Sequence, residues 1–283
     1  MKRTFAAAAN QLPTPGNGRR FEEVKQQMLA SLQGMVYIKS DKQLDYLRPL
    51  FGRINPLVIA TLNYDNAIEN AAEQNGWKWT DGLDEWNGNR ALLPSVFDQK
   101  TAYLLKLHGS VYWQHDKVQD DDEYNHHRSR VGNMPRSAFT STNFVRADLK
   151  MLNNGAHTNP GVIFGGSNKL THEGPFLEVL RSFQQYLDNV NILTVIGYSF
   201  RDQHINAPIG RWLEKDSSHI LRIVDPCFSK CDAPFAKQIM SFMKDNSGRV
   251  SVMELQPTLS ASEYNKLVCN FTGDCLRELY GGN

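Results

Sequence analysis

The sequence has few cysteines, and none of them lies before residue 227. The four are Cys227, Cys231, Cys269 and Cys275, in CxxxC and CxxxxxC spacings. Structural zinc sites mostly use CxxC pairs, so these spacings give no support for a metal. We therefore expect reduced thiols that serve packing, and no metal cofactor.

The chain also lacks a strong charge of either sign and a long hydrophobic run. Its 31 Lys and Arg residues nearly balance its 30 Asp and Glu residues, for a net charge of +1. No basic field is available for nucleic acid, and no apolar stretch approaches the roughly 20 residues that cross a bilayer. The first ten residues, MKRTFAAAAN, contain too few consecutive apolar residues for a secretion signal. These absences predict a cytoplasmic protein that binds neither membrane nor nucleic acid.

Five short apolar runs, each ending in a polar or glycine cluster, are the main positive feature. They are LVIATLNYD (57–65), YLLKLHGS (103–110), GVIFGGSN (161–168), NILTVIGYSFRD (191–202) and ILRIVDP (220–226). Such runs are typical of strands buried on both faces of a parallel sheet. We predict an α/β fold, with a Rossmann-like parallel sheet covered by helices on both faces.

The predicted organisation is one large domain with two additions. Residues 1–56 are expected to be an irregular start followed by helices, and residues 57–283 to form the Rossmann-like domain. A polar segment at about 111–160 is expected to form a small insertion lobe. Helices are predicted from the spacing of apolar residues, at 21–35, 41–51, 65–76, 175–189, 202–215, 234–244 and 261–279.

The residues that follow these strands are candidates for a ligand site, because ligands bind beyond the carboxyl ends of parallel strands. Asn63 could hold a ribose hydroxyl or a water, and Asp65 could accept hydrogen bonds. Equally, Asn63 could be a turn residue and Asp65 a helix cap. His108, with a reference pKa near ~6.5, could take a proton, or could simply be a strand-end histidine bonded to a carbonyl.

Glycine and aspartate mark the other strand ends. Gly165 and Gly197 with Ser199 lie in turns whose backbone N–H groups suit phosphate oxygens, although tight turns also require glycine without a ligand. Asp225 could accept bonds from the two hydroxyls of an adenosine ribose, or could be a turn residue before a proline. His204 could face the site or the core.

In this order, TLNYD, KLHGS, PGVIFGG, IGYS and IVDP resemble the sirtuin family. They are most similar to its bacterial sirtuin-like branch, many of whose members consume NAD in anti-phage defence. The resemblance covers residues 57–226. It implies NAD as the substrate, with Asn63 beside the nicotinamide ribose, His108 as the general base and Asp65 near the nicotinamide pocket. It also places Gly165, Gly197 and Ser199 at NAD and Asp225 at the ribose.

Three departures from the sirtuin pattern bear on activity. Residues 111–160 contain no cysteine, so the zinc ribbon typical of protein-deacylating sirtuins is missing, and FGG replaces FGE at Gly166. Before residue 57 there is also no apolar strand followed by the GAGxS loop that wraps the pyrophosphate. A fragment, a two-chain enzyme or a diverged protein would each explain this. The expected structural symptom is an unpaired sheet edge beside the strand at 57–62.

The resemblance implies a sirtuin-like NAD glycohydrolase that forms nicotinamide and ADP-ribose. The alternative is a catalytically silent module that binds NAD or ADP-ribose or serves assembly; an NAD-dependent deacylase fits less well. A homo-oligomer or a defence partner protein is a further expectation from the resemblance.

Overall fold

The computed structural model of this chain describes most of its carboxyl-terminal half and selected parts of the rest. The described residues are 24, 27–29, 31–39, 44–86, 94, 97–115, 130–131, 134–135, 144–147, 160–162, 175–246, 248–255 and 261–280. The chain divides into two compact units. Unit 1 comprises residues 1–42 and 58–182, and unit 2 comprises residues 43–57 and 183–283.

Unit 1 contains a three-stranded sheet in the order β1-β3-β2. Its strands are β1 (Leu57–Thr61), β2 (Lys78–Thr80) and β3 (Thr101–Lys106). All six residues of β3 are buried, as expected for a central strand, and β2 pairs with β3 in parallel. β1 lies at one edge of this sheet, and no other strand among the described residues pairs with its outer side.

The helix α4 (Ala67–Gln74) follows β1 and packs in unit 1 through the predicted apolar face. Ala71 and Ala72 are fully buried, and Gly76 ends the turn after the helix with a φ of +71°. The helix begins two residues later than predicted, with Asn66 rather than Asp65 at the N-cap position. Asn66 instead faces an earlier segment, where its side chain bonds both the N–H and the carbonyl of Ile38.

A second sheet of unit 1 has the order β7-β4-β8 and is antiparallel. Its strands are β4 (Gly109–His115), β7 (Phe144–Arg146) and β8 (Pro160–Val162), while β5 (Arg130–Val131) and β6 (Met134–Pro135) pair separately. The run at 161–168 was predicted as a strand of the parallel sheet. Its described part is β8, which pairs antiparallel with β4, because the chain turns back directly after β3.

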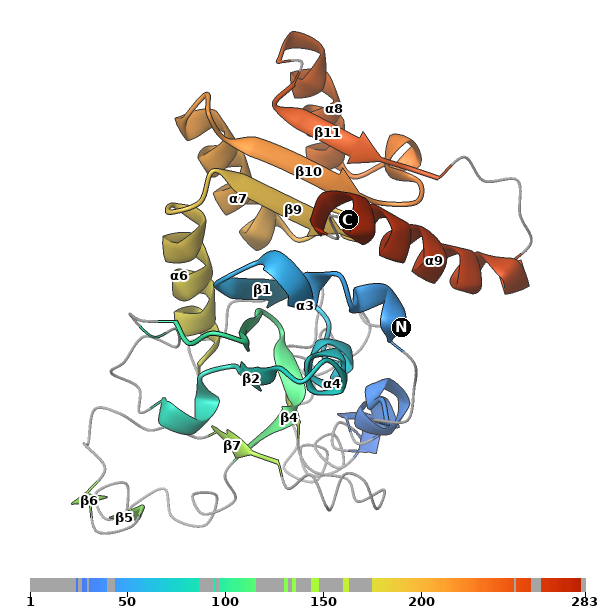
Figure 1. Ribbon diagram of the computed structural model, residues 1–283. Helices are drawn as coiled ribbons and strands as arrows, with labels where there is room; N and C mark the ends of the chain where they lie inside the picture. The colour runs from blue at the N-terminus through green and yellow to red at the C-terminus, as the bar shows by residue number, and fades with distance from the viewer. Residues whose placement is uncertain are drawn as a thin grey trace, which may run out of the picture. The chain divides into compact units, whose positions relative to one another are not determined.

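Unit 2 contains a parallel sheet in the order β11-β10-β9 (Figure 1). Its strands are β9 (Ile192–Ile196), β10 (Ile220–Val224) and β11 (Val250–Met253). β10 is the central strand, and its Leu221, Ile223 and Val224 are almost completely buried. The strands β9 and β10 lie where the apolar runs predict them.

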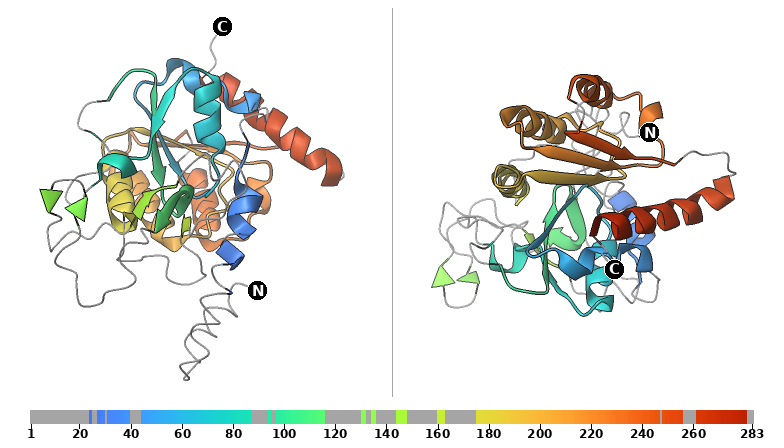
Figure 2. Two further views of the ribbon diagram at one scale, coloured as in Figure 1. Left: turned by 90° about the horizontal axis from the view of Figure 1, so that it is seen from below. Right: turned by 45° about the horizontal axis from the view of Figure 1, so that its top comes forward.

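Helices cover both faces of this sheet (Figure 2). The helices α7 (Gln203–Lys215) and α8 (Pro234–Asp245) lie on one face, and α9 (Ala261–Tyr280) lies on the other, where Tyr280 donates to Thr194 of β9. α9 also packs against η1 (Asp45–Leu47), with Gly273 against Tyr46. Pro49 separates η1 from α3 (Leu50–Arg53), as its position predicts.

Further helical segments belong to this outline, including the helical residues 31–36 of unit 1. α6 (Phe176–Leu187) is where the chain passes from unit 1 to unit 2, and η2 (Leu83–Glu85) and η4 (Phe228–Lys230) are short turns. None of the described helices combines the length and apolarity needed to span a membrane. The predicted α/β class with a Rossmann-like parallel sheet flanked by helices is confirmed.

Candidate functional site

In unit 1, the carboxyl ends of β1 and β3 lie side by side. The N–H of Leu107, directly after β3, donates to the carbonyl of Thr61, the last residue of β1, at 2.9 Å. The two strands therefore run in the same direction and end at the same edge of the sheet. The segments carrying Asn63 and His108 begin at this point, so the structure brings these two predicted residues to one sheet edge.

The loop after β1 is held by several hydrogen bonds. The N–H of Asn63 donates to Thr61 Oγ1 at 3.1 Å, and the carbonyl of Tyr64 accepts from the N–H of Val111 at 2.9 Å. Asp65 Oδ1 accepts from the N–H of Ala67 at 3.1 Å. Asp65 therefore satisfies the first backbone N–H of α4. The Asn63 side chain is exposed, where a ligand could reach it.

His108 lies in the tight turn between β3 and β4. The residue is buried, and its ring lies 6.5 Å from that of Tyr64 between centroids. Gly109 follows with a φ of +88°, and a Cβ there would lie 2.0 Å from the carbonyl oxygen of Gly161. Gly109 is thus required for the close approach of another backbone.

A buried ion pair, which was not among the predicted site residues, bonds the backbone of this loop. Lys106, in β3, donates from Nζ to Glu69 Oε1 at 3.0 Å and to the carbonyl oxygen of Asp65 at 2.6 Å. Both side chains are almost inaccessible to solvent. Burial raises the pKa of the Glu69 carboxyl, and the Lys106 ammonium opposes that shift. The available signal was a lysine inside an otherwise apolar strand.

In unit 2, Gly197, Ser199 and Asp225 lie at the carboxyl ends of β9 and β10. These strands are paired neighbours, with Ile196 opposite Val224, and the N–H of Gly197 donates to the Val224 carbonyl at 2.9 Å. Gly197 has a φ of +62°, so this turn favours glycine. The structure therefore brings the three predicted residues to one edge of the unit 2 sheet.

The side chain of Tyr198 fixes the turn between Gly197 and Ser199. Its hydroxyl donates to Asn206 Oδ1 at 2.8 Å and accepts from the N–H of Asp202 at 3.2 Å. Burial raises the pKa of this hydroxyl above its ordinary value. Asp225 Oδ1 accepts from the N–H of Cys227 at 2.8 Å, so the turn role predicted for Asp225 is present.

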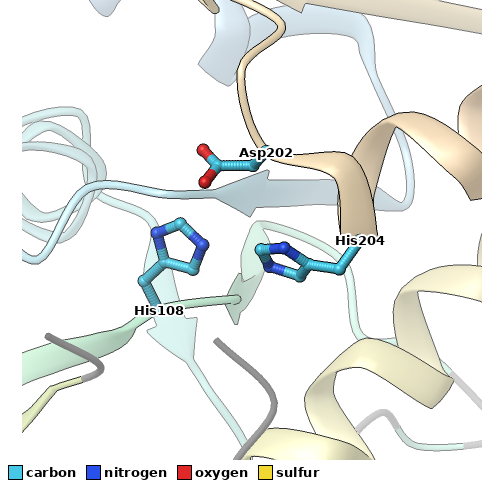
Figure 3. A group of neighbouring side chains, drawn as sticks. All are labelled: His108, Asp202 and His204. Carbon is cyan, nitrogen blue, oxygen red and sulfur yellow. The ribbon is translucent and has the colours of Figure 1, made fainter. Parts of the chain in front are cut away.

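Asp202 and His204 stand at the start of α7, and Figure 3 shows both there, with His108 in the turn after β3. A carboxylate oxygen of Asp202 and a ring nitrogen of His204 lie within 4.8 Å of each other. Asp202 is the N-cap residue of α7, although its side chain makes no capping hydrogen bond. The predicted site residue Gly165 lies outside the described residues.

These positions can be compared with known proteins. The family model described as SIR2-like domain matches residues 57–234 of the chain. This range includes β1, the candidate residues at the strand ends of unit 1 and those at the strand ends of unit 2. Among curated proteins, no significant match to the chain is found. Because the family model covers more than half of the chain, this protein belongs to the SIR2-like, or sirtuin-like, family.

Proposed function

We propose that this protein is a sirtuin-like NAD glycohydrolase, which cleaves NAD to nicotinamide and ADP-ribose. The observation that carries the proposal is the hydrogen bond between Leu107 and Thr61, which sets the Asn63 loop and the His108 turn at one sheet edge. An amide and an imidazole at adjacent strand ends are suited to orient and deprotonate a water or a ribose hydroxyl. Membership of the SIR2-like family supports NAD as the substrate.

The reaction assigned to these residues breaks one bond and forms one. The bond between the nicotinamide nitrogen and the ribose breaks, its electron pair leaves with nicotinamide, and an oxocarbenium-like ribose develops. The oxygen of a water held by Asn63 then bonds to this carbon, and His108 accepts the proton that the water releases. In unit 2, the backbone at Gly197 and Ser199 would meet the pyrophosphate, and Asp225 the adenosine ribose.

Release of nicotinamide from NAD by the purified chain tests the proposal. We expect His108→Ala and Asn63→Ala each to lower kcat/KM by about 10²- to 10⁴-fold, the range for loss of a general base or its partner. Asn75→Ala is the matched control, since Asn75 ends α4 and its side chain bonds the carbonyl of Ala71. Unchanged turnover in both His108→Ala and Asn63→Ala would remove these residues from the mechanism.

A second candidate is a catalytically silent module that binds NAD or ADP-ribose or serves assembly. The absence of a GAGxS-like loop before residue 57 favours it, because that loop wraps the pyrophosphate in the family. Heat of ADP-ribose binding in a calorimeter, without nicotinamide release from NAD, would support it. Activity on an acetyl-lysine peptide would instead support a deacylase, against which the cysteine-free segment at 111–160 argues.

The biological role that we propose is anti-phage defence, in the cytoplasm, through consumption of NAD. It follows from the resemblance to the sirtuin-like branch in which that role is common. Cells that express the chain should lose NAD upon phage infection, and cells that express His108→Ala should keep it. Equal NAD levels in both during infection would contradict the defence role without affecting the enzymatic proposal.

A further inference from the structure

A buried lysine in β3 bonds the backbone of the candidate catalytic loop. Lys106 is 1% exposed and lies two residues before His108. Its ammonium group has three donors, and one of them reaches the carbonyl oxygen of Asp65 at 2.6 Å. Lys106 therefore connects the strand that leads into His108 to the loop that carries Asn63.

Two backbone amides also donate hydrogen bonds to this loop. The exchange rates of their hydrogens therefore report on the position of the loop around Asp65. The N–H of Ala67 donates to the Asp65 carboxylate, and the N–H of Val111 donates to the carbonyl of Tyr64. Both amides depend on the loop keeping its position. The N–H of Lys78, which donates to the carbonyl of Lys100, lies elsewhere in unit 1 and serves as an internal reference.

Stability alone does not account for this buried pair. Replacing a buried ion pair by apolar side chains is often neutral or stabilising, because both charges lose their hydration. Among the described residues, no group donates a hydrogen bond to Glu69 Oε2, so the pair is not fully satisfied. What Lys106 adds beyond its pairing with Glu69 is the bond to the Asp65 backbone.

We infer that Lys106 is a positioning residue, whose bond to the Asp65 carbonyl fixes the loop of Asn63 and Asp65 relative to His108. Its catalytic consequence rests on the proposed function, whereas its effect on the loop does not. Small displacements of a group that orients water are costly, since a shift of about 1 Å lowers rates by up to about 100-fold.

Two variants separate positioning from stability. Lys106→Met combined with Glu69→Leu removes both charges and the bond to Asp65, and fills the space with apolar groups of similar size. Glu69→Gln leaves Lys106 and both of its acceptors in place. Urea unfolding establishes that each variant is folded, and amide hydrogen exchange then reports on the loop.

In the double variant we expect the amides of Ala67 and Val111 to exchange at least about tenfold faster, while that of Lys78 is unchanged. In Glu69→Gln all three should exchange as in the wild type. The kcat for NAD, calculated per folded molecule from the urea unfolding data, should fall about 10- to 100-fold in the double variant, with KM for NAD nearly unchanged.

The inference is overturned if the folded double variant keeps wild-type exchange at Ala67 and Val111. A second outcome is that the two amides exchange faster in the double variant, but the wild type itself does not turn over NAD. That outcome would refute the proposed function and support the inference about Lys106. If the double variant does not fold, Lys106→Leu with Glu69→Met also removes both charges and the donor to Asp65, and the same comparison applies.

Discussion

Two aspartates in this protein each make a local hydrogen bond through one carboxylate oxygen and have a second oxygen that can bind a ligand. Asp65 accepts from the N–H of Ala67, and Asp225 accepts from the N–H of Cys227, in each case through Oδ1. Each of these bonds engages one of the two carboxylate oxygens. The structural and the ligand-binding interpretations of these residues are therefore compatible, and the sequence alone could not separate them.

Glu69 predicts a pH dependence of stability. Burial raises the pKa of its carboxyl above the ordinary value of 4.5 despite the Lys106 ammonium. A carboxyl with a higher pKa in the folded state contributes its full stability below that ordinary value and loses it as the pH rises through the folded value. We expect the wild type to lose stability relative to Glu69→Gln as the pH rises above 4.5.

The measurement is the difference in the free energy of unfolding between the two proteins in urea, from about pH 4 to about pH 8. The side-chain amide that Glu69→Gln introduces does not titrate, so the difference follows the loss of the carboxyl and of its ion pair with Lys106. A difference that is independent of pH, or that changes in the opposite direction, contradicts the assigned pKa shift.

At the scale of elements, apolar periodicity identified the helices and parallel strands closely. Helix α6 and strands β9 and β10 lie within a few residues of their predicted ranges, because each is long or strongly apolar and is bounded by glycine, proline or polar residues. The antiparallel β4–β8 pair was not predicted. Its pairing depends on a turn at His108 and on a chain return from residue 160, neither of which has a periodic signal.

Strand β7 is anchored to η2 by a partly buried charge network. Asp81 accepts from Arg146 and, at 2.7 Å, from Trp113 Nε1, and Arg146 also bonds the more exposed Asp84. Burial would lower the pKa of Arg146, but the two carboxylates raise it above its ordinary value. The network therefore pairs the partly buried Arg146 guanidinium with two carboxylates.

We expect Asp81→Asn to lower the free energy of unfolding by about 2–3 kcal/mol, since it weakens charge-assisted hydrogen bonds at a buried position. Asp84→Asn is the matched control, and its cost should stay below about 1 kcal/mol because that carboxylate is largely in water. Urea unfolding of both variants provides the comparison. Equal losses of unfolding free energy in the two variants would show that burial does not decide how much each aspartate contributes to stability.

At the scale of the whole molecule, the match to the SIR2-like domain extends over both units. Unit 1 holds Asn63 and His108 at one sheet edge, and unit 2 holds Gly197, Ser199 and Asp225 at another. The proposed function assigns chemistry to the first group and binding of the adenosine end of NAD to the second. We therefore expect substitutions of the unit 1 residues to change kcat, and substitutions of the unit 2 residues to change KM for NAD.

We expect Asp225→Ala to raise KM for NAD about tenfold with little change in kcat, because the proposed function gives Asp225 a ribose contact made equally before and during reaction. Asn63→Ala should instead lower kcat. Asp225→Asn is the control, since an amide oxygen can still accept from the N–H of Cys227 and keep the turn. Steady-state kinetics would contradict the division if Asp225→Ala lowered kcat alone.

The sequence by itself determined the α/β class, most element positions and the family, because these follow from short-range periodicity and from motifs at strand ends. Only the tertiary structure decided that Lys106 meets Glu69 and Asp65, and that Arg146 meets Asp81, across 37, 41 and 65 positions of the chain. It likewise decided that the run at 161 begins as an antiparallel strand. Such partners are set by the path of the chain between distant segments, and a local pattern carries no information about that path.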